Sequence, residues 1–232
     1  AAAVTRKEQD RRCGWVNNLA INAPDHRVHQ RKQRPVHCGR AIDKGRNVRG
    51  PGSARMSSID IVGGIYHERC IWPTWDQFFG SGGRAAAALV GHVDRITLQS
   101  YARADTAAIF QAYANAFGFT FAPQNAPQTI SFEYIHCLSI PVTRPAIGHI
   151  KINPPISIKA PVVLRFGMME GTAIVDADRC VYDPQSTFSP EPFEQNGSQA
   201  KCLAIVANRG ETIAMGQNAD PIVAARNLLM SG

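Results

Sequence analysis

Three short segments carry residue types that could do chemistry at the ends of strands. The first, residues 63–68, reads Gly-Gly-Ile-Tyr-His-Glu and directly follows the predicted strand 59–62, Ile-Asp-Ile-Val. A carboxylate just past the end of a strand, here that of Glu68, can accept hydrogen bonds from the hydroxyl groups of a ligand. An isolated glutamate is more often a solvated surface residue, because glutamate is mostly exposed in folded proteins. Glu68 therefore indicates a binding site only if neighbouring segments also carry residues that can bind a ligand.

The second segment is the glycine-rich stretch 80–84, Gly-Ser-Gly-Gly-Arg, which precedes an alanine-rich run at 84–90. Glycines let a backbone approach a ligand closely, and a helix N-terminus offers free N–H groups and a partial positive charge. The same glycines could serve only a turn. The spacing does not match the Walker phosphate loop, and the dinucleotide fingerprint fails at Ala85. The stretch predicts a strand-to-helix turn that favours anions.

The third segment, residues 206–211, places Asn208 and Glu211 three positions apart after an apolar run. Side chains with this spacing on a turn can both face one ligand or a hydrated Mg²⁺ ion. The same spacing is that of a helix capping box, in which Asn208 caps the helix and Glu211 reaches back. The sequence leaves these two interpretations open.

The elements that must position these residues begin near Met56. Apolar patterns predict strands and helices that alternate along the chain, which indicates an α/β domain with a mostly parallel sheet. Ligands of such folds bind at the carboxyl ends of the strands. The stretch 119–158 departs from this rhythm and predicts a small β lid. The expected strands are 59–62, 95–101, 119–121, 161–166, 179–182 and 203–207, and the expected helices are 84–90, 105–117 and 221–230.

The first quarter of the chain differs from the rest in charge and pattern. Residues 1–55 hold 13 Lys+Arg and 4 Asp+Glu, whereas residues 56–232 hold 12 and 14. The first segment shows no apolar period and is rich in Arg, Asn, Gln, Pro and Gly, so we expect it to be disordered. The near-neutral remainder is typical of a metabolic enzyme, and nucleic acid is not an expected partner.

Residues 1–55 allow three other interpretations. A basic arm could contact nucleic-acid phosphates, although Trp15 is its only aromatic residue. A zinc site would need paired ligand knuckles, which its cysteines and histidines do not form. A misplaced start codon would explain why the chain becomes foldable at Met56, and we favour this hypothesis. The zinc candidates are Cys13, His26, His29, His37 and Cys38.

The whole-chain composition is that of an ordinary globular protein, with 44% apolar and 19% charged residues. The longest apolar runs are far shorter than the ~18–20 residues of a membrane-spanning helix, so no membrane partner is expected. No secretory signal is recognisable, which makes the cytoplasm the expected compartment. The six cysteines include no C-x-x-C pair, and we expect reduced thiols rather than a disulfide framework.

Taken together and in order, the three segments resemble motifs of the ribokinase-like (PfkB) carbohydrate and nucleoside kinase family. In that family a first strand ends in G-S-x-N-x-D, and residues 63–68 match it with Glu68 in the place of the sugar-binding acid. The family's substrate segment G-G-K-x-x-N is similar to 82–87, with Arg84 for Lys and Ala87 for Asn.

The later part of the chain also resembles the family. Asn208 and Glu211 match its N-x-x-E motif, which influences Mg²⁺ and phosphate binding. The strand and acid at 163–170 resemble its middle segment, and Val-Tyr-Asp-Pro at 181–184 resembles its strand ending in D-P or N-P. The resemblance covers essentially all of 56–232 and implies a ribokinase-like three-layer sandwich with a mostly parallel sheet and a lid.

The resemblance implies an ATP-dependent phosphorylation of a sugar or nucleoside hydroxyl, with Mg²⁺ as the cofactor. Glu68, Gly82, Gly83 and Arg84 would bind the substrate, and Asn208 and Glu211 would help to order the metal. The family's G-A-G-D segment, which holds its catalytic base and anion hole, does not occur in this sequence. We therefore expect a C-terminally truncated kinase domain that does not turn over alone.

Other functions remain open at the sequence level. A non-catalytic module could keep the α/β core and use the cleft to bind a sugar or nucleoside for sensing or assembly. A nucleic-acid-binding protein could act through residues 1–55. The expected β lid could also carry a homodimer interface.

Overall fold

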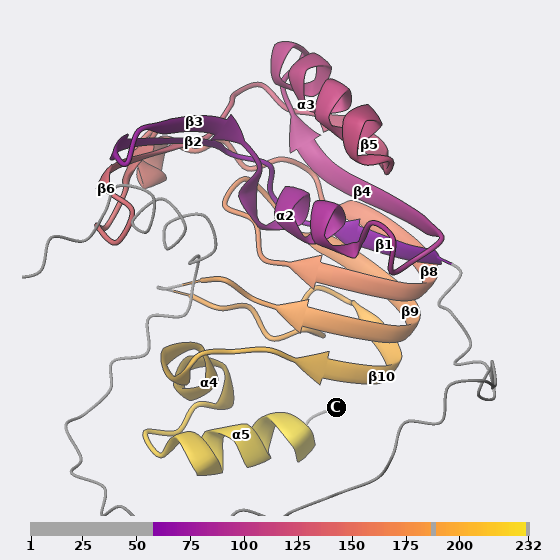
Figure 1. The fold of residues 1–232 in the computed structure, drawn as a ribbon. Helices are drawn as coiled ribbons and strands as arrows, with labels where there is room; N and C mark the ends of the chain where they lie inside the picture. The colour runs from indigo at the N-terminus through magenta and orange to yellow at the C-terminus, as the bar shows by residue number, and fades with distance from the viewer. Residues whose placement is uncertain (1–57, 187–188, 231–232) are drawn as a thin grey trace, which may run out of the picture. The chain divides into compact units, whose positions relative to one another are not determined.

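The computed structural model describes residues 58–186 and 189–230 (Figure 1). The expectations for residues 1–55, including the zinc, nucleic-acid and start-codon hypotheses, lie outside the described residues. In the part of the chain that the structure describes, no helix combines the length and apolar character needed to cross a membrane.

The core of the domain is a six-stranded sheet in the order β10-β9-β8-β1-β4-β5, in which every neighbouring pair runs parallel. The predicted α/β class with a mostly parallel sheet is confirmed. The central strand β1 buries the successive side chains of Ile61 and Val62 completely, although Asp60 interrupts its apolar sequence and is only partly buried. The strands are β1 (Ser58–Val62), β4 (Arg95–Ala102), β5 (Thr120–Asn125), β8 (Ile156–Phe166), β9 (Ala173–Asp183) and β10 (Gln199–Ile205).

Helices α2 (Gly80–Leu89) and α3 (Ala104–Phe117) pack on the half of the sheet formed by β1, β4 and β5. Phe110 of α3 is fully buried and contacts the rings of Phe79 and Phe121. Helix α3 ends at Gly118, whose φ of 89° is the left-handed conformation common after helices.

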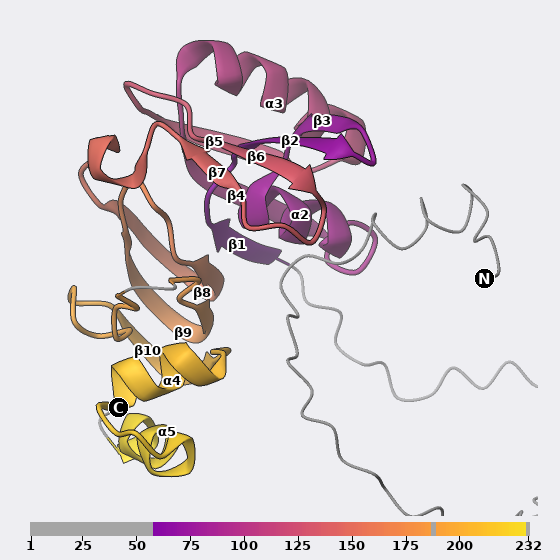
Figure 2. The same ribbon diagram turned by 90° about the vertical axis from the view of Figure 1, so that its left-hand side faces the viewer.

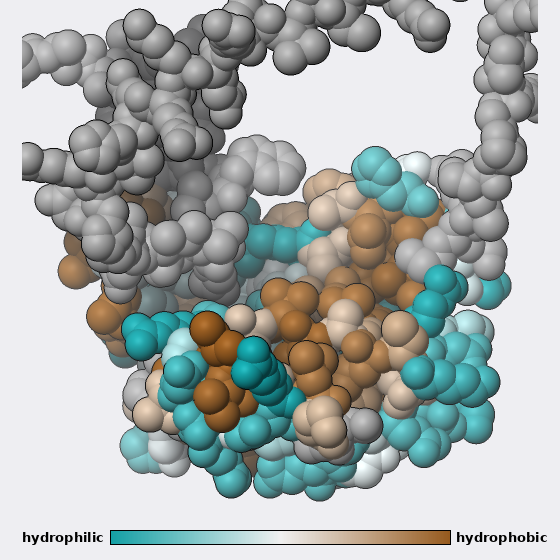
Figure 3. Space-filling model, turned by 90° about the horizontal axis from the view of Figure 1, so that it is seen from below, coloured by the Kyte–Doolittle hydropathy of each residue, from teal (hydrophilic) through white to brown (hydrophobic). Residues whose placement is uncertain are grey.

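Two further helices, α4 (Arg209–Gly216) and α5 (Pro221–Met230), follow β10. Helix α5 begins as predicted, because the Asp220 carboxylate accepts hydrogen bonds from the N–H groups of Ile222 (2.8 Å) and Val223 (3.3 Å). Seen from below, apolar side chains gather on the face of the molecule that these elements form (Figure 3). The large exposed apolar residues there are Val206, Ile222, Val223, Leu229 and Met230.

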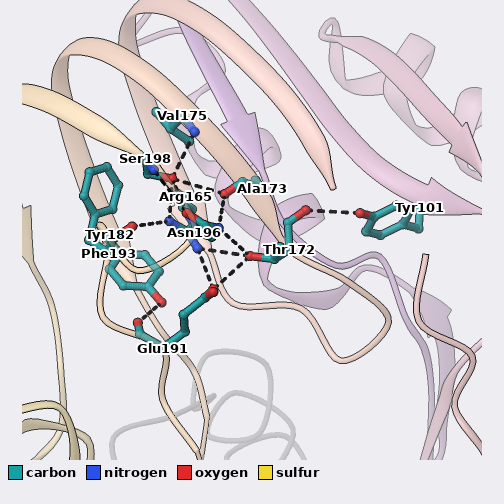
Figure 4. Close-up of polar contacts among 10 residues, drawn as sticks. All are labelled: Tyr101, Arg165, Thr172, Ala173, Val175, Tyr182, Glu191, Phe193, Asn196 and Ser198. Carbon is teal, nitrogen blue, oxygen red and sulfur yellow. Dashed lines mark hydrogen bonds and ion pairs between the residues drawn. The ribbon is translucent and has the colours of Figure 1, made fainter. Parts of the chain in front are cut away.

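Strands β8 and β9 are bent back on themselves (Figure 4). Each strand has 11 residues, and the two strands pair in parallel. The chain must therefore return from the end of β8 to the start of β9 through residues 167–172 alone. A straight strand of that length spans about 33 Å, and a six-residue link reaches about 25 Å at most. The pairing is interrupted at one equivalent position in each of the neighbouring strands β8, β9 and β10, at Pro161, Asp178 and Lys201. All three strands therefore bend at the same level of the sheet.

The bend lets these strands cover one of their own faces. Buried side chains from both arms, such as Ile158 and Val163 of β8 and Val175 and Tyr182 of β9, form a second apolar core. Strands β8 and β9 therefore run longer than the predicted 161–166 and 179–182. Their first arms alternate apolar residues with charged ones such as Lys159 and Asp176, which form an ion pair of 2.7 Å at the bend.

A separate four-stranded sheet, in the order β3-β2-β6-β7, forms the lid (Figure 2). Its strands are β2 (His67–Trp72), β3 (Trp75–Phe78), β6 (Ser131–His136) and β7 (Val142–Arg144), followed by the short 3-10 helix η1 (Ile147–His149). The strands of this sheet lie at 67–78 and 131–144, whereas the predicted lid range is 119–158. Residues 120–125 pair with β4 in the main sheet, whereas 67–78 form a lid hairpin directly after β1.

We expect the Phe110→Ala substitution to lower the free energy of unfolding by about 3–5 kcal/mol, because it removes a fully buried ring between α3 and the sheet. Urea unfolding followed by circular dichroism measures this change. Ile109→Ala, on the adjacent half-exposed position of the same helix, is the control and should change the stability by less than about 1 kcal/mol. Equal losses in the two variants would contradict the packing described here.

Candidate functional site

The carboxyl ends of the six parallel strands meet at one edge of the main sheet. The lid hairpin leaves β1 at this edge, and α2 returns to it. Open parallel sheets bind ligands at such edges, where loops from several strands gather. The predicted residues Glu68, Gly82, Gly83 and Arg84 lie on β2 and on the first turns of α2.

Helix α2 begins at Gly80, four residues before its predicted start. The glycines of its first turn have no side chain, so the helix can pack directly against the end of β1. A Cβ on Gly80, whose φ is +60°, would lie 2.2 Å from the Gly64 carbonyl oxygen, and one on Gly82 would lie 2.8 Å from that of Gly63. The N–H of Gly82 donates to the Gly64 oxygen (3.2 Å). The close backbone approach predicted for these glycines is thus an approach to the protein's own chain.

Gly83 has a similar packing role. Its Cβ would lie 2.9 Å from the ring of Phe110, and its N–H donates to the carbonyl oxygen of Phe79 (3.1 Å). The hydroxyl of Ser81 in the same turn is buried and has no hydrogen-bond partner among the described residues. This hydroxyl has a hydrogen bond to offer at the start of α2, and sequence reasoning did not single it out.

Glu68 and Arg84 contact each other. Arg84 Nη1 donates to Glu68 Oε1 at 3.0 Å, and Arg84 Nη2 donates to Glu68 Oε2, so the ion pair is bidentate. The Glu68 residue is 5% exposed, and the Arg84 side chain is 32% exposed. Burial raises the pKa of the adjacent Tyr134 phenol to about 12, and the Glu68 charge adds to this effect. The pair joins lid strand β2 to helix α2, and the Arg84 side chain stays partly exposed.

A second buried carboxylate, Glu170, lies after β8 at the same edge. Its Oε2 accepts a hydrogen bond from the Tyr66 hydroxyl (3.0 Å), which in turn accepts one from the Met169 N–H (3.2 Å). Glu170 is 4% exposed, and burial raises its pKa from 4.5 to about 7. The motif comparison pointed only to an acid in this region and assigned it no role, because burial of a single glutamate leaves no sequence pattern.

A small cavity lies beside Glu170. Its volume of about 10 Å³ is close to the space that one water molecule needs. The Gln128 Nε2 group at this cavity is buried without a partner among the described residues. The cavity is lined by Ile65, Tyr101, Ala102, Arg103, Thr106, Gln128, Thr129, Ile130 and Glu170.

Asn208 and Glu211 form a capping box at the start of α4. Asn208 Oδ1 accepts from the Glu211 N–H (3.0 Å), and Glu211 Oε2 accepts from the Asn208 N–H (2.8 Å). The other oxygen of the buried Glu211 accepts from the Ser186 N–H (3.0 Å). Within residues 58–186 and 189–230, no three His, Cys, Asp or Glu side chains gather as metal ligands. The contacts of Asn208 and Glu211 are therefore those of the helix capping box, one of the two interpretations that the sequence left open.

The guanidinium of Arg165 lies at the centre of a polar network at the ends of β8 and β9 (Figure 4). It donates to Glu191 Oε2 (3.0 Å), to Thr172 Oγ1 (3.1 Å) and to Ser198 Oγ (3.0 Å). The Cζ atom of this guanidinium lies 4.5 Å from the centre of the Tyr182 ring. Arg165 is only 2% exposed, so these contacts compensate a buried charge and fix the loops that surround the edge.

No family model matches the chain, and no curated protein matches its sequence. Among solved structures, the chain is similar to a pyrophosphate-dependent kinase in the ribokinase family complexed with a pyrophosphate analog and myo-inositol, at 12% identity and a TM-score of 0.45, over 75% of this chain and 70% of that one. It is also similar to the tetrameric inhibited form of phosphofructokinase-2 from Escherichia coli, at 12% identity and a TM-score of 0.47, over 76% and 71%.

A carbohydrate kinase from Agrobacterium tumefaciens is similar at 11% identity and a TM-score of 0.38, over 74% of this chain and 67% of that one. Likenesses at these identities and scores carry no argument about activity. The α/β class of this chain rests on its own strand order and pairing.

We expect Arg84→Met to lower the free energy of unfolding by about 2 kcal/mol, because it leaves the buried Glu68 carboxylate without its partner. Arg144→Met removes a comparable pair with Glu133 on the exposed part of the lid and should cost less than about 1 kcal/mol. Thermal unfolding of the two variants at pH 7 gives the comparison. A loss for Arg84→Met no larger than that for Arg144→Met would show that the buried pair is not important for stability.

Proposed function

We propose that residues 56–232 form the substrate-binding part of a ribokinase-like kinase domain, whose parent activity is the ATP-dependent phosphorylation of a sugar or nucleoside hydroxyl. The observation that carries the proposal is the Glu68–Arg84 pair, which lies where the lid meets the carboxyl edge of the sheet. Carboxylate oxygens accept hydrogen bonds and guanidinium N–H groups donate them, so the pair offers a polyol both kinds of partner.

The proposed roles follow from the positions of the residues. Glu68 and Arg84 hold ligand hydroxyl groups from the lid side and from the helix side. Gly82 lets α2 come close to the end of β1, and Gly83 lets the same turn pack against the Phe110 ring, so together they bring Arg84 to this edge. The lid strands above them exclude water from the bound ligand, which strengthens each polar contact.

The assignment of Asn208 and Glu211 to Mg²⁺ and ATP remains part of the proposal. Because the Glu211 carboxylate already accepts two backbone hydrogen bonds, it would bind the ion through its remaining lone pairs and keep its place at the start of α4. Phosphoryl transfer depends on positioning and charge stabilisation. When bound, the metal would supply charge neutralisation next to the phosphates.

Binding without turnover is the proposed behaviour of this polypeptide alone. Its 232 residues contain no G-x-G-D segment that could supply a base and an anion hole. The second candidate function, a non-catalytic sugar- or nucleoside-binding module, shares the same site. An ATP-consumption assay with a panel of sugars and nucleosides tests both candidates, because robust turnover would exclude the binding module and the inactive fragment alike.

Calorimetric titration with the same panel tests the site. We expect at least one uncharged polyol to bind the wild-type chain and Glu68→Gln to weaken that binding by about tenfold or more, since the substitution removes a charged acceptor. Glu133→Gln, a matched change in the exposed lid pair with Arg144, should leave the affinity unchanged. Equal affinities of the wild-type chain and Glu68→Gln would contradict the proposed role of Glu68.

The lid also carries the proposed homodimer interface. Large apolar side chains are exposed on and around its strands, and Ile140 reaches 94% exposure. Such a cluster is unusual for a surface that faces only water. A second copy of the chain is the proposed occupant, because two lids can cover each other with self-complementary faces. The exposed residues are Ile71, Trp72, Ile135, Leu138, Ile140, Val142 and Ile147.

We expect Ile140→Asp to shift the chain toward a monomer by at least tenfold in dimer dissociation constant, because it places a charge in the apolar interface. Sedimentation velocity over a concentration series measures the shift. Leu229→Asp on α5, the other exposed apolar surface, is the control and should leave the dimer intact. If Leu229→Asp dissociates the dimer and Ile140→Asp does not, the interface lies on α5 instead.

A further inference from the structure

Three connections of the chain meet at the small cavity beside Glu170. One is the start of helix α3, another leads from β5 into lid strand β6, and the third joins β8 to β9. The cavity therefore lies where three loops at the carboxyl edge of the sheet pack together, and a molecule inside it contacts all three. The polar residues at the cavity are Arg103, Thr106, Gln128, Thr129 and Glu170.

The segment that enters the lid is held at both ends by backbone hydrogen bonds. The Ala126 N–H donates to the carbonyl oxygen of Ala102 (3.0 Å), and the Ile130 carbonyl oxygen accepts from the His67 N–H (3.0 Å). Between these anchors, the Nε2 group of Gln128 is buried and has no hydrogen-bond partner among the described residues. Buried polar groups of folded proteins nearly always have a partner. The cavity is therefore the place from which an acceptor for this amide can come.

The other polar groups at the cavity include acceptor oxygens. Glu170 is 4% exposed, and its Oε2 accepts a hydrogen bond from the Tyr66 hydroxyl (3.0 Å). A carboxylate can accept about four hydrogen bonds, so Glu170 keeps acceptor sites for a further donor. The Oγ1 atoms of Thr106 and Thr129 lie 2.7 Å apart in a hydrogen bond of their own, and each can accept another. These oxygens line the same space as the Gln128 amide.

A donor and several acceptors around one small space favour a neutral occupant that both accepts and donates. A cation would lie against the N–H groups of Gln128, and an anion would lie against the oxygens of Glu170. The Arg103 guanidinium, which also lines the cavity, is held in an ion pair with Asp105. The volume of about 10 Å³ has room for a single water-sized molecule. Water meets the requirements of both charge and size.

We propose that this cavity is a binding site for one long-lived water molecule, which accepts a hydrogen bond from Gln128 Nε2 and donates to Glu170 and to one of the threonine hydroxyls. About three hydrogen bonds are typical of buried water. The water ties the middle of the segment that enters the lid to the β8–β9 connection and to the start of α3. No ligand takes part, so the proposal is independent of the proposed function.

The place of the water gives it a role in positioning the lid entry. Backbone hydrogen bonds hold the two ends of the segment 126–130, and the water links its middle to the body. Without the water the segment is free to shift, and the hydrogen bond between His67 and Ile130 at the start of lid strand β2 would open more often. The order of this junction between lid and body therefore depends on the bound water.

Water–amide NOE spectroscopy of the ligand-free full chain tests the site. The side-chain amide protons of Gln128 should give cross-peaks to water with the sign of a bound, long-lived molecule. The side-chain amide of Gln124, an exposed residue of β5, is the control in the same spectrum and should give no cross-peak of that sign. A Gln128 amide without such a cross-peak would overturn the proposal, and so would equal cross-peaks from the two glutamines.

Gln128→Met provides the variant, because it keeps the length of the side chain and removes the donor. Magnetic relaxation dispersion of the water nuclei counts long-lived waters, and we expect its amplitude to fall by about one water molecule in this variant. Hydrogen exchange of the His67 amide should become at least threefold faster while exchange in α3 stays unchanged. Gln124→Met is the matched control and should change neither quantity.

Equal dispersion amplitudes in the wild-type chain and Gln128→Met would contradict the water site. A lost water with unchanged exchange at His67 would contradict its role at the lid entry. Loss of polyol binding in the calorimetric titration would contradict the proposed function without affecting either result.

Discussion

The buried guanidinium of Arg165 is the interaction on which the carboxyl edge of this sheet depends. A charge with 2% exposure persists only if hydrogen bonds and opposite charge compensate its lost hydration. Its partners come from the β8–β9 connection and from the loop that follows β9, namely Thr172, Glu191, Phe193 and Ser198. The contacts of Nη1 and Nη2 therefore fix both loops, and through them the segment that holds Glu170, while Nε is buried without a partner among the described residues.

The bend in β8 and β9 explains why the connection between these two parallel strands, residues 167–172, can be so short. Because each strand turns back on itself, its first and last residues lie at the same edge of the sheet, where Tyr101 reaches the carbonyl oxygens of both Pro154 and Thr172. The two arms bury their apolar side chains against each other, as helices do on the β1–β4 half of the sheet. A short connection then carries Glu170 to the segment just before lid strand β2, where it contacts Tyr66.

The sequence predicts the parallel core well, because β1, β4 and the second arms of β8 and β9 are apolar enough to be recognised. It does not predict the first arms, where Lys159 and Asp176 interrupt the apolar pattern, or the hairpin at 67–78, which is absent from the expected strands. Glu68 and Arg84 were singled out by the resemblance of their segments to the family's motifs, whereas their mutual ion pair depends on how β2 and α2 are placed in the fold. The raised pKa of Glu170 depends on burial, which no local pattern encodes.

The central claim is that the junction of lid, α2 and β1 binds a polyhydroxylated ligand. The most direct measurement is a two-dimensional amide NMR titration of the chain with uncharged sugars and nucleosides, at constant pH so that Glu170 does not titrate. The account predicts saturable shifts at the amides of Glu68, Arg84 and their neighbours on β2 and α2. Saturable shifts confined to the charged groove at the bend, around Lys159 and Lys201, or no shifts with any member of the panel, would contradict it.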